Sequence, residues 1–236
     1  MSTKKFSPNW KYVVGEIILI FLGISLAISF QNWNQNRLLK QEQIIAQNDL
    51  KVGLETVIVE FDEFIEREDG YLNLMLTLSQ EHALDSIAKL DEFDSLVHNG
   101  LFNFGTISAN FPSYEALKNS GKINLIRDQS MKVKLGHLET GFQSFVQSIN
   151  EQLDLQIKNI DPVILKYFDF PRLHEGYYKL GTQHISQNKN HLQILKSPEV
   201  QNIISYKAAI ARGIKEEIVT LIKECKEVLD EFEKYN

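Results

Sequence analysis

The sequence predicts an all-α protein in which a single N-terminal transmembrane helix continues into an elongated antiparallel helical bundle. Residues 12–30 are almost wholly apolar, and apolar residues recur at steps of three and four along much of the remaining chain. No segment alternates convincingly between apolar and polar residues, as a half-buried strand does. We therefore expect a short cytoplasmic tail (1–11), a transmembrane helix (12–30) and an extracytoplasmic helical-bundle domain (31–236).

The apolar run has the dimensions of a membrane span. Residues 12–30 in a helix cover about 28 Å, close to the hydrocarbon thickness of a bilayer. Trp10 and Tyr12 stand at one end and Trp33 beyond the other, as interfacial aromatic residues do. Glu16 lies one turn inside the first end, where headgroups and the helix dipole reduce the cost of a carboxylate.

Two alternatives to a permanent anchor exist. Residues 27–29, Ala-Ile-Ser, resemble the cleavage site of a signal peptide, and a buried helix of a soluble protein is also apolar. The length of the run, the acid within it and the helical pattern that resumes directly after it favour an uncleaved anchor.

One side of this predicted span carries Glu16, Gly23 and Ala27. Gly23 and Ala27 form a small-xxx-small pair, which permits close packing of two membrane helices, and Glu16 would add a polar contact. The alternative is an interfacial acid on an isolated anchor, with the small residues there by chance. Basic residues before the run slightly outweigh those after it, which favours a cytoplasmic N-terminus.

The first helix of the domain is predicted to continue from the span, because no proline occurs in residues 9–111. Asp69-Gly70 is a candidate kink. Apolar residues at helical spacing predict its buried stripe: Leu50, Leu54, Val57, Phe61, Phe64, Tyr71, Met75 and Leu78.

Shorter elements are predicted next. Residues 84–97 are expected to form a helix and residues 98–113, rich in Gly, Asn and Phe, a loop. Ser113 is a candidate N-cap of a short helix that ends at Gly121.

A long helix is predicted to begin after Asp128, a candidate N-cap, and to stop at Asp161-Pro162. Residues 167–181 are expected to be irregular, and a last helix begins with Ser197 as N-cap and Pro198 at the first helical position. Two stripes support these helices: Met131, Leu135, Leu138, Phe142, Phe145 and Ile149; then Ala211, Ile214, Ile218, Leu221, Cys225, Val228 and Phe232.

The charge balance argues against nucleic-acid binding. The chain has a formal net charge of −6, and residues 31–236 alone have 22 basic against 30 acidic residues, a net charge of −8. An acidic domain repels phosphate backbones.

Catalytic and metal-binding patterns are weak. The six histidines have no zinc-ligand spacing, so no metal and no cofactor are expected. Cys225 falls on an apolar stripe, which indicates a buried, inert thiol. Acids cluster in residues 60–69, and their helical interleaving with apolar residues predicts a solvated helix face: Glu60, Asp62, Glu63, Glu66, Glu68 and Asp69.

The aromatic stretch after residue 166 is the strongest candidate for a partner or ligand surface. The alternative is that it plugs one end of the bundle. Its residues are Tyr167, Phe168, Phe170, Arg172, His174, Tyr177 and Tyr178.

Two blocks resemble a family of unknown function, DUF6090, that is common in Bacteroidota. Residues 14–37, VGEIILIFLGISLAISFQNWNQNR, are similar to its N-terminal membrane segment, and residues 114–131, YEALKNSGKINLIRDQSM, to a second block. The resemblance implies a bacterial single-span membrane protein with an extracytoplasmic helical domain. It implies no activity and no site residue with a known task, although it includes Glu16.

The leading prediction is a non-enzymatic module in the bacterial inner membrane, with a periplasmic body that binds a protein partner or self-associates. The lipid bilayer is thus one expected partner, and another protein or a second copy is the other. The alternative prediction is an extracytoplasmic sensor of a small ligand, read by a separate membrane partner. A hydrolytic enzyme is a third possibility, disfavoured because no convergent catalytic set occurs.

Overall fold

The computed structural model describes residues 10–80, 90–103, 105–107, 110–178 and 191–234, which are predominantly helical and contain no strand. This confirms the predicted all-α class. The elements in chain order are α1 (Trp10–Ser79), α3 (Leu90–Val97), the π-helix η1 (His98–Phe102), α4 (Pro112–Asn119), the 3-10 helix η2 (Lys122–Leu125), α5 (Gln129–Leu155), the π-helix η3 (Gln156–Ile160), α6 (Asp161–Tyr167), α7 (Phe170–Tyr178), α8 (His191–Leu195) and α9 (Pro198–Lys234).

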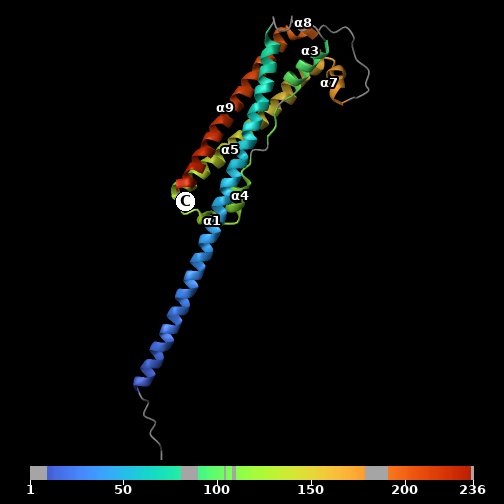
Figure 1. The fold of residues 1–236 in the computed structure, drawn as a ribbon. Coiled ribbons are helices and arrows are strands. Elements are labelled where there is room, and N and C mark those ends of the chain that lie inside the picture. Colours follow the sequence, from blue (N-terminus) through green and yellow to red (C-terminus); the bar gives the residue numbers. More distant parts are fainter. Residues whose placement is uncertain (1–9, 81–89, 104, 108–109, 179–190, 235–236) are drawn as a thin grey trace, which may run out of the picture.

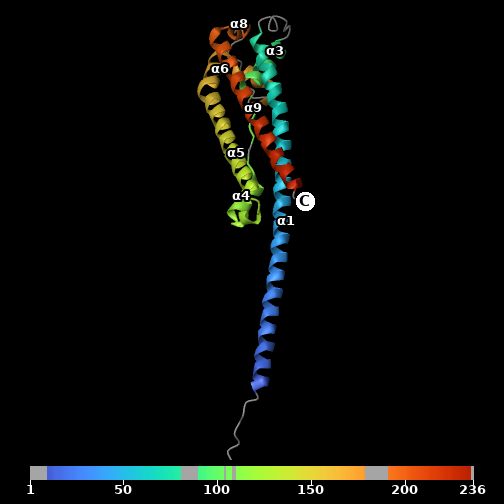
Figure 2. The same cartoon turned by 90° about the vertical axis from the view of Figure 1, so that its left-hand side faces the viewer.

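The three long helices α1, α5 and α9 form an elongated bundle (Figure 1). Helix α9 runs antiparallel to α1, because Lys51 of α1 lies 3.5 Å from Glu233 near the end of α9. It also runs antiparallel to α5, because Lys134, near the start of α5, lies 2.7 Å from Glu231. Helices α1 and α5 therefore point the same way, and the chain returns along the bundle between them, as Figure 2 shows.

The predicted stripes form the larger of two hydrophobic cores. The α1 stripe from Leu50 to Phe64 is buried in it, as are the α5 stripe from Met131 to Phe145 and the α9 stripe from Ile214 to Phe232. Phe61 lies at the centre, with its ring 5.7 Å from that of Phe142 and 5.6 Å from that of Phe145. Steps of three and four therefore predicted the packed faces of the long helices correctly.

A second core closes the end of the bundle far from the N-terminus. The last turns of α1 and the first turns of α9 meet α3, η1, α6, α7 and α8 there (Figure 1). Its buried side chains include Met75, Leu101, Ile164 and Phe168.

The N-terminal part of α1 extends beyond the other helices as a single helix (Figures 1 and 2). Leu50 is the first buried residue of α1, so the part from Trp10 to Leu50 has a length of about 60 Å at about 1.5 Å per residue. The helix passes Asp69-Gly70 without ending, and the predicted continuity between the apolar run and the first helix of the bundle is confirmed.

Several predicted caps are confirmed. The Asp128 carboxylate accepts hydrogen bonds from the backbone N–H groups of Ser130 and Met131 at 2.6 and 3.1 Å. Gly121, which follows α4, has the left-handed φ of 71° that glycine adopts most easily. Helix α9 begins at Pro198, as its missing N–H allows.

Other boundaries were predicted wrongly. Ser113 is not the N-cap of α4: Pro112 occupies the first turn, so the cap is Phe111, whose carbonyl accepts from the N–H groups of Tyr114 and Glu115. Asp161-Pro162 does not stop the helical path, because Pro162 lies in the first turn of α6, where no N–H is needed.

Two segments expected to lack regular structure contain helix. The supposed irregular stretch 167–181 is helical at its start, with the end of α6 and all of α7, and residues 179–181 lie outside the described residues. The predicted loop 98–113 starts as the π-helix η1 and ends inside α4. Of the predicted helix 84–97, the described part is α3.

Candidate functional site

The apolar run is exposed along its whole length. Helix α1 contains one stretch that is long and apolar enough to cross a membrane, and none of it is buried within the described chain. Phe21 and Leu26 are 68% and 70% exposed. Large exposed apolar surfaces are rare on proteins that remain in water, and they mark contacts with a membrane or a partner.

Glu16, Gly23 and Ala27 lie on one side of this exposed stretch, as their spacing requires. A Cβ built on Gly23 would meet no atom within 4 Å. The surface beside Gly23 is therefore open to a close approach by another helix. The predicted packing role of these three residues stays a prediction.

The aromatic stretch lies at the far end of the bundle, where it packs into the second core. Phe168 and His174 are buried, whereas Tyr167, Phe170 and Arg172 are half-buried. The Phe170 and His174 rings stack with centroids 3.8 Å apart, and the His98 ring meets His174 edge-on at 4.4 Å. This packing is the geometry expected of a plug.

Polar contacts join the aromatic stretch to its neighbours. The Arg172 Nε donates to Asp94 Oδ2 at 2.6 Å, which joins α7 to α3. The Tyr167 hydroxyl donates to Glu199 at 2.5 Å, which joins α6 to α9. Tyr177 and Tyr178 belong to α7, but their side chains lie outside the described residues, so the predicted partner or ligand surface is not decided by these contacts.

The sequence did not predict a buried polar network between the two cores. Lys207 of α9 is 3% exposed, and its ammonium donates to the carbonyls of Leu101 and Asn103 at 2.5 and 2.7 Å. Glu68 of α1, also 3% exposed, accepts the backbone N–H of Gly105 at 2.7 Å. The network fixes the segment after η1 between α1 and α9.

Glu68 is therefore not part of a solvated face, contrary to the prediction, although Glu60, Asp62, Glu63 and Glu66 are exposed. Glu68 follows the buried Phe64 by four residues and therefore lies on the side of α1 that faces the core. Its helical position, and not its charge, decides that it is buried.

Burial changes the ionisation of this network. Desolvation lowers the pKa of Lys207 to about 7, against the opposing attraction of Glu68 and Asp161. Desolvation likewise raises the pKa of Glu68, although the Gly105 N–H favours the ionised form. The hydrogen bonds of both groups do not require a charge, because a neutral amine still donates to a carbonyl and a neutral carboxyl still accepts from an N–H.

The buried side-chain amide of Gln156 also belongs to this network. The Gln156 Nε2 group, in η3, donates to Leu101 O at 3.1 Å and to Asp161 Oδ1 at 2.6 Å. The arrangement satisfies main-chain carbonyls that would otherwise be buried without donors, which is a structural task.

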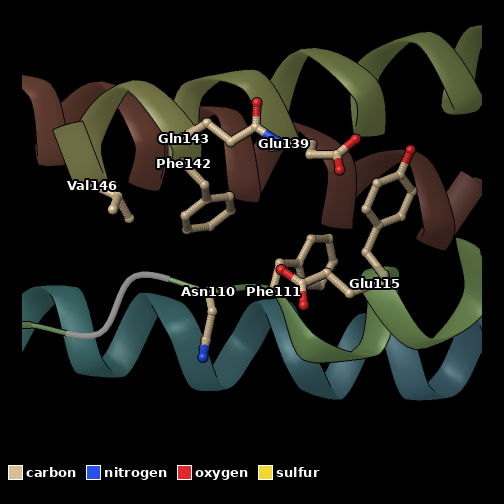
Figure 3. A pocket seen from close by; sticks show the side chains of 8 residues that line it. Asn110, Phe111, Glu115, Glu139, Phe142, Gln143 and Val146 are labelled. Atoms are coloured by element: carbon tan, nitrogen blue, oxygen red, sulfur yellow. The ribbon is translucent and has the colours of Figure 1, made fainter. Parts of the chain in front are cut away.

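Two cavities of the described chain border α4. One of about 240 Å³ lies between α5 and the start of α4, where Figure 3 shows Phe142 pointing towards Phe111. The two ring centroids are 6.1 Å apart, and Glu139 at its edge binds the Lys118 ammonium at 2.7 Å. This cavity is smaller than a typical ligand pocket.

A larger cavity of about 660 Å³ lies between α1 and the α4–η2 segment. It is lined by Ile45, Ala46 and Leu117, and Lys122 lies 3.4 Å from Glu42 among its polar residues.

Two further kinds of site, a metal cluster and a reactive thiol, concern the Cys, His, Asp and Glu side chains. Among the described residues, no three His, Cys, Asp or Glu side chains converge on a point that could hold a metal ion. Cys225 is buried, and desolvation raises the pKa of its thiol to about 12, so the reactive thiolate is suppressed.

Comparison with known proteins identifies a family. The model of a family of unknown function, DUF6090, matches residues 16–175. No curated protein and no solved structure matches. The matched residues make up more than half of the chain and run from Glu16, in the exposed apolar stretch, into α7. The chain belongs to the DUF6090 family of unknown function.

Proposed function

We propose that this protein is a single-pass, membrane-anchored helical module that acts as a protein-interaction or scaffold subunit and performs no catalysis. Residues 12–30 lie in the bacterial inner membrane, and the bundle stands away from it in the periplasm.

The observation that carries this proposal is the exposure of the apolar run on a helix continuous with the bundle. Burying these apolar side chains in lipid removes them from water, which is favourable by about 25 cal/mol of free energy per Å² of apolar surface. The rigid connection matters as well. A helix that runs from Trp10 into the core at Leu50 holds the bundle at a fixed distance from the bilayer, as a spacer for a partner would require.

Fractionation of the full chain tests the anchor. Vesicles from a bacterium that expresses the chain are washed with alkaline carbonate, which strips peripheral proteins. We expect the chain to stay in the pellet. The variant Phe21→Asp places a charge near the predicted bilayer centre, at a cost of about 2.5–3.5 kcal/mol, and should shift the chain towards the supernatant.

A matched control places the same charge on the same helix outside the predicted membrane. Gln43→Asp should leave the chain in the pellet. Release of the unmodified chain by carbonate, or equal release of both variants, would contradict the anchor. Protease digestion of spheroplasts tests the orientation, since a periplasmic body is digested without lysis.

A second candidate function, sensing a small ligand, is favoured by the cavity beside α4. Its volume of about 660 Å³ falls within the range of small-molecule sites. A ligand that binds the folded state raises the melting temperature. A shift that Ala116→Trp abolishes, with folding unchanged, would support sensing over simple scaffolding.

A further inference from the structure

Helix α1 carries a second apolar line, on the side opposite to the core. Leu38, Ile45 and Val52 are spaced seven residues apart and are 48%, 60% and 52% exposed. Because each residue advances about 100° round a helix, Val52 lies about 200° from the buried Leu50. Leu38 and Ile45 precede the first buried residue of α1.

A period of seven is typical of a helix that pairs with another helix, since 3.5 residues per turn keep one seam facing the partner. Counting back from Leu38 by sevens gives Gln31, Ile24 and Ile17, so the seam enters the apolar run. The companion positions, three residues after each seam residue, are Ile20, Ala27, Asn34, Gln41 and Asn48. They are apolar in the run and uncharged amides beyond it.

The next companion position limits the length of the contact. It is Glu55, which would face an identical carboxylate in a parallel pair. The seam and its companion positions are thus free of like charges from Ile17 to Val52, although the next residue at this spacing, Val59, is also apolar and exposed. Helix α4 lies at the edge of this face, because Ile45 also borders the cavity beside it.

Flanking charges agree with a parallel, in-register pair. Arg37 precedes the seam residue Leu38, and Glu42 lies five residues after Arg37, which is the spacing of the salt bridges that flank parallel coiled coils. Within one chain, Arg37 lies over the Trp33 ring at 5.7 Å and Glu42 lies 3.4 Å from Lys122, so the interchain salt bridge would form beside these contacts. A shared membrane would set the same direction and the same height for two anchored copies.

We propose that two copies of this chain associate in parallel and in register through the outer face of α1, from the apolar run to Val52. The inference rests on the proposed membrane anchor and names a second copy of the chain as the partner. Ala27 is one of the companion positions, and Gly23 directly precedes the seam residue Ile24. The bundles are then held side by side at a fixed height above the membrane.

Disulfide mapping in native membranes tests this pairing. In the full chain with Cys225→Ala, single cysteines are introduced one at a time along the stalk and oxidised in vesicles. Cysteines at the seam and companion positions should form covalent dimers: Leu38, Gln41, Ile45, Asn48 and Val52. Cysteines on the opposite side should form at least about tenfold less dimer, because their side chains point away from the seam: Asn36, Lys40 and Gln43.

A second variant probes the seam directly. Ile45→Glu should reduce dimer formation through a cysteine at Gln41, whereas Gln43→Glu should not. Equal crosslinking round the helix, no crosslinking, or a product with the mass of another protein would overturn the pairing.

The same vesicles are washed with carbonate. If the chain stays in the pellet but crosslinks do not recur at steps of three and four residues, the pairing is overturned and the anchor is not. If the chain is released into the supernatant, the anchor is overturned, together with the pairing that rests on it.

Discussion

Replacing Lys207 by Met should destabilise the bundle by about 2–4 kcal/mol. Asn103 O loses the ammonium that donates to it at 2.7 Å, and a buried carbonyl without a donor costs about 1–3 kcal/mol. Leu101 O loses one donor but keeps the Gln156 amide, so its loss is about 1 kcal/mol. The methionine fills most of the vacated volume, which limits the cavity cost.

Urea unfolding of the detergent-solubilised full chain, followed by circular dichroism, measures this difference. Lys215→Met is the matched control: Lys215 also lies on α9 and binds Asp69 at 2.6 Å, but its side chain is 34% exposed. Such a pair contributes about 1 kcal/mol or less. The reasoning is refuted if Lys207→Met costs no more than Lys215→Met.

The same experiment has a pH signature. The pKa of Lys207 is about 7 in the fold, below the 10.5 of a free lysine, so the unfolded chain binds more protons between these values. Stability should therefore rise with pH from 7 to 8.5, by as much as about 1.4 kcal/mol per pH unit. Lys207→Met should flatten this rise.

Other predictions concern acidification and glycine substitution. Burial lowers the pKa of His98 to about 4, against 6.5 in the unfolded chain, so the unfolded chain binds more protons between these values. Acidification from pH 6.5 to 4 should therefore lower the free energy of unfolding by up to about 3 kcal/mol, measured by urea unfolding. A free energy of unfolding that does not change over this range would contradict the prediction. Gly105→Ala places a methyl group against the Glu68 carboxylate and 2.6 Å from Phe64, and should lower the unfolding free energy by about 1–3 kcal/mol. Gly136→Ala, with open space around it, should instead stabilise α5 by up to about 1 kcal/mol, and a loss equal to that of Gly105→Ala would refute the steric argument.

The long helices were predictable because their packing depends on a period. Each stripe residue repeats the same environment, so Phe61 and Phe145 are placed in the core by spacing alone. The short elements depend on single contacts instead. Pro112, for example, displaces Ser113 from the cap because φ of proline suits the first turn, which spacing does not reveal.

The buried polar network did leave a signal in the sequence. Lys207 lies between Ile204 and Ala211 on one stripe, and Glu68 lies between Phe64 and Met75 on another. A charged residue on each of two core stripes, opposite in sign, indicates burial of both. Their partners, the carbonyls after η1, could not be predicted, because main-chain groups carry no sequence signature.

The membrane anchor is tested most directly by the fluorescence of Trp10 and Trp33, the only tryptophans of the chain. They lie about 35 Å apart along α1, one beyond each end of the apolar run. In reconstituted vesicles, we expect both to emit at blue-shifted wavelengths and to be quenched more strongly by lipids brominated near the headgroup than by lipids brominated deep in the chains. Water-like emission without quenching would contradict a span over residues 12–30.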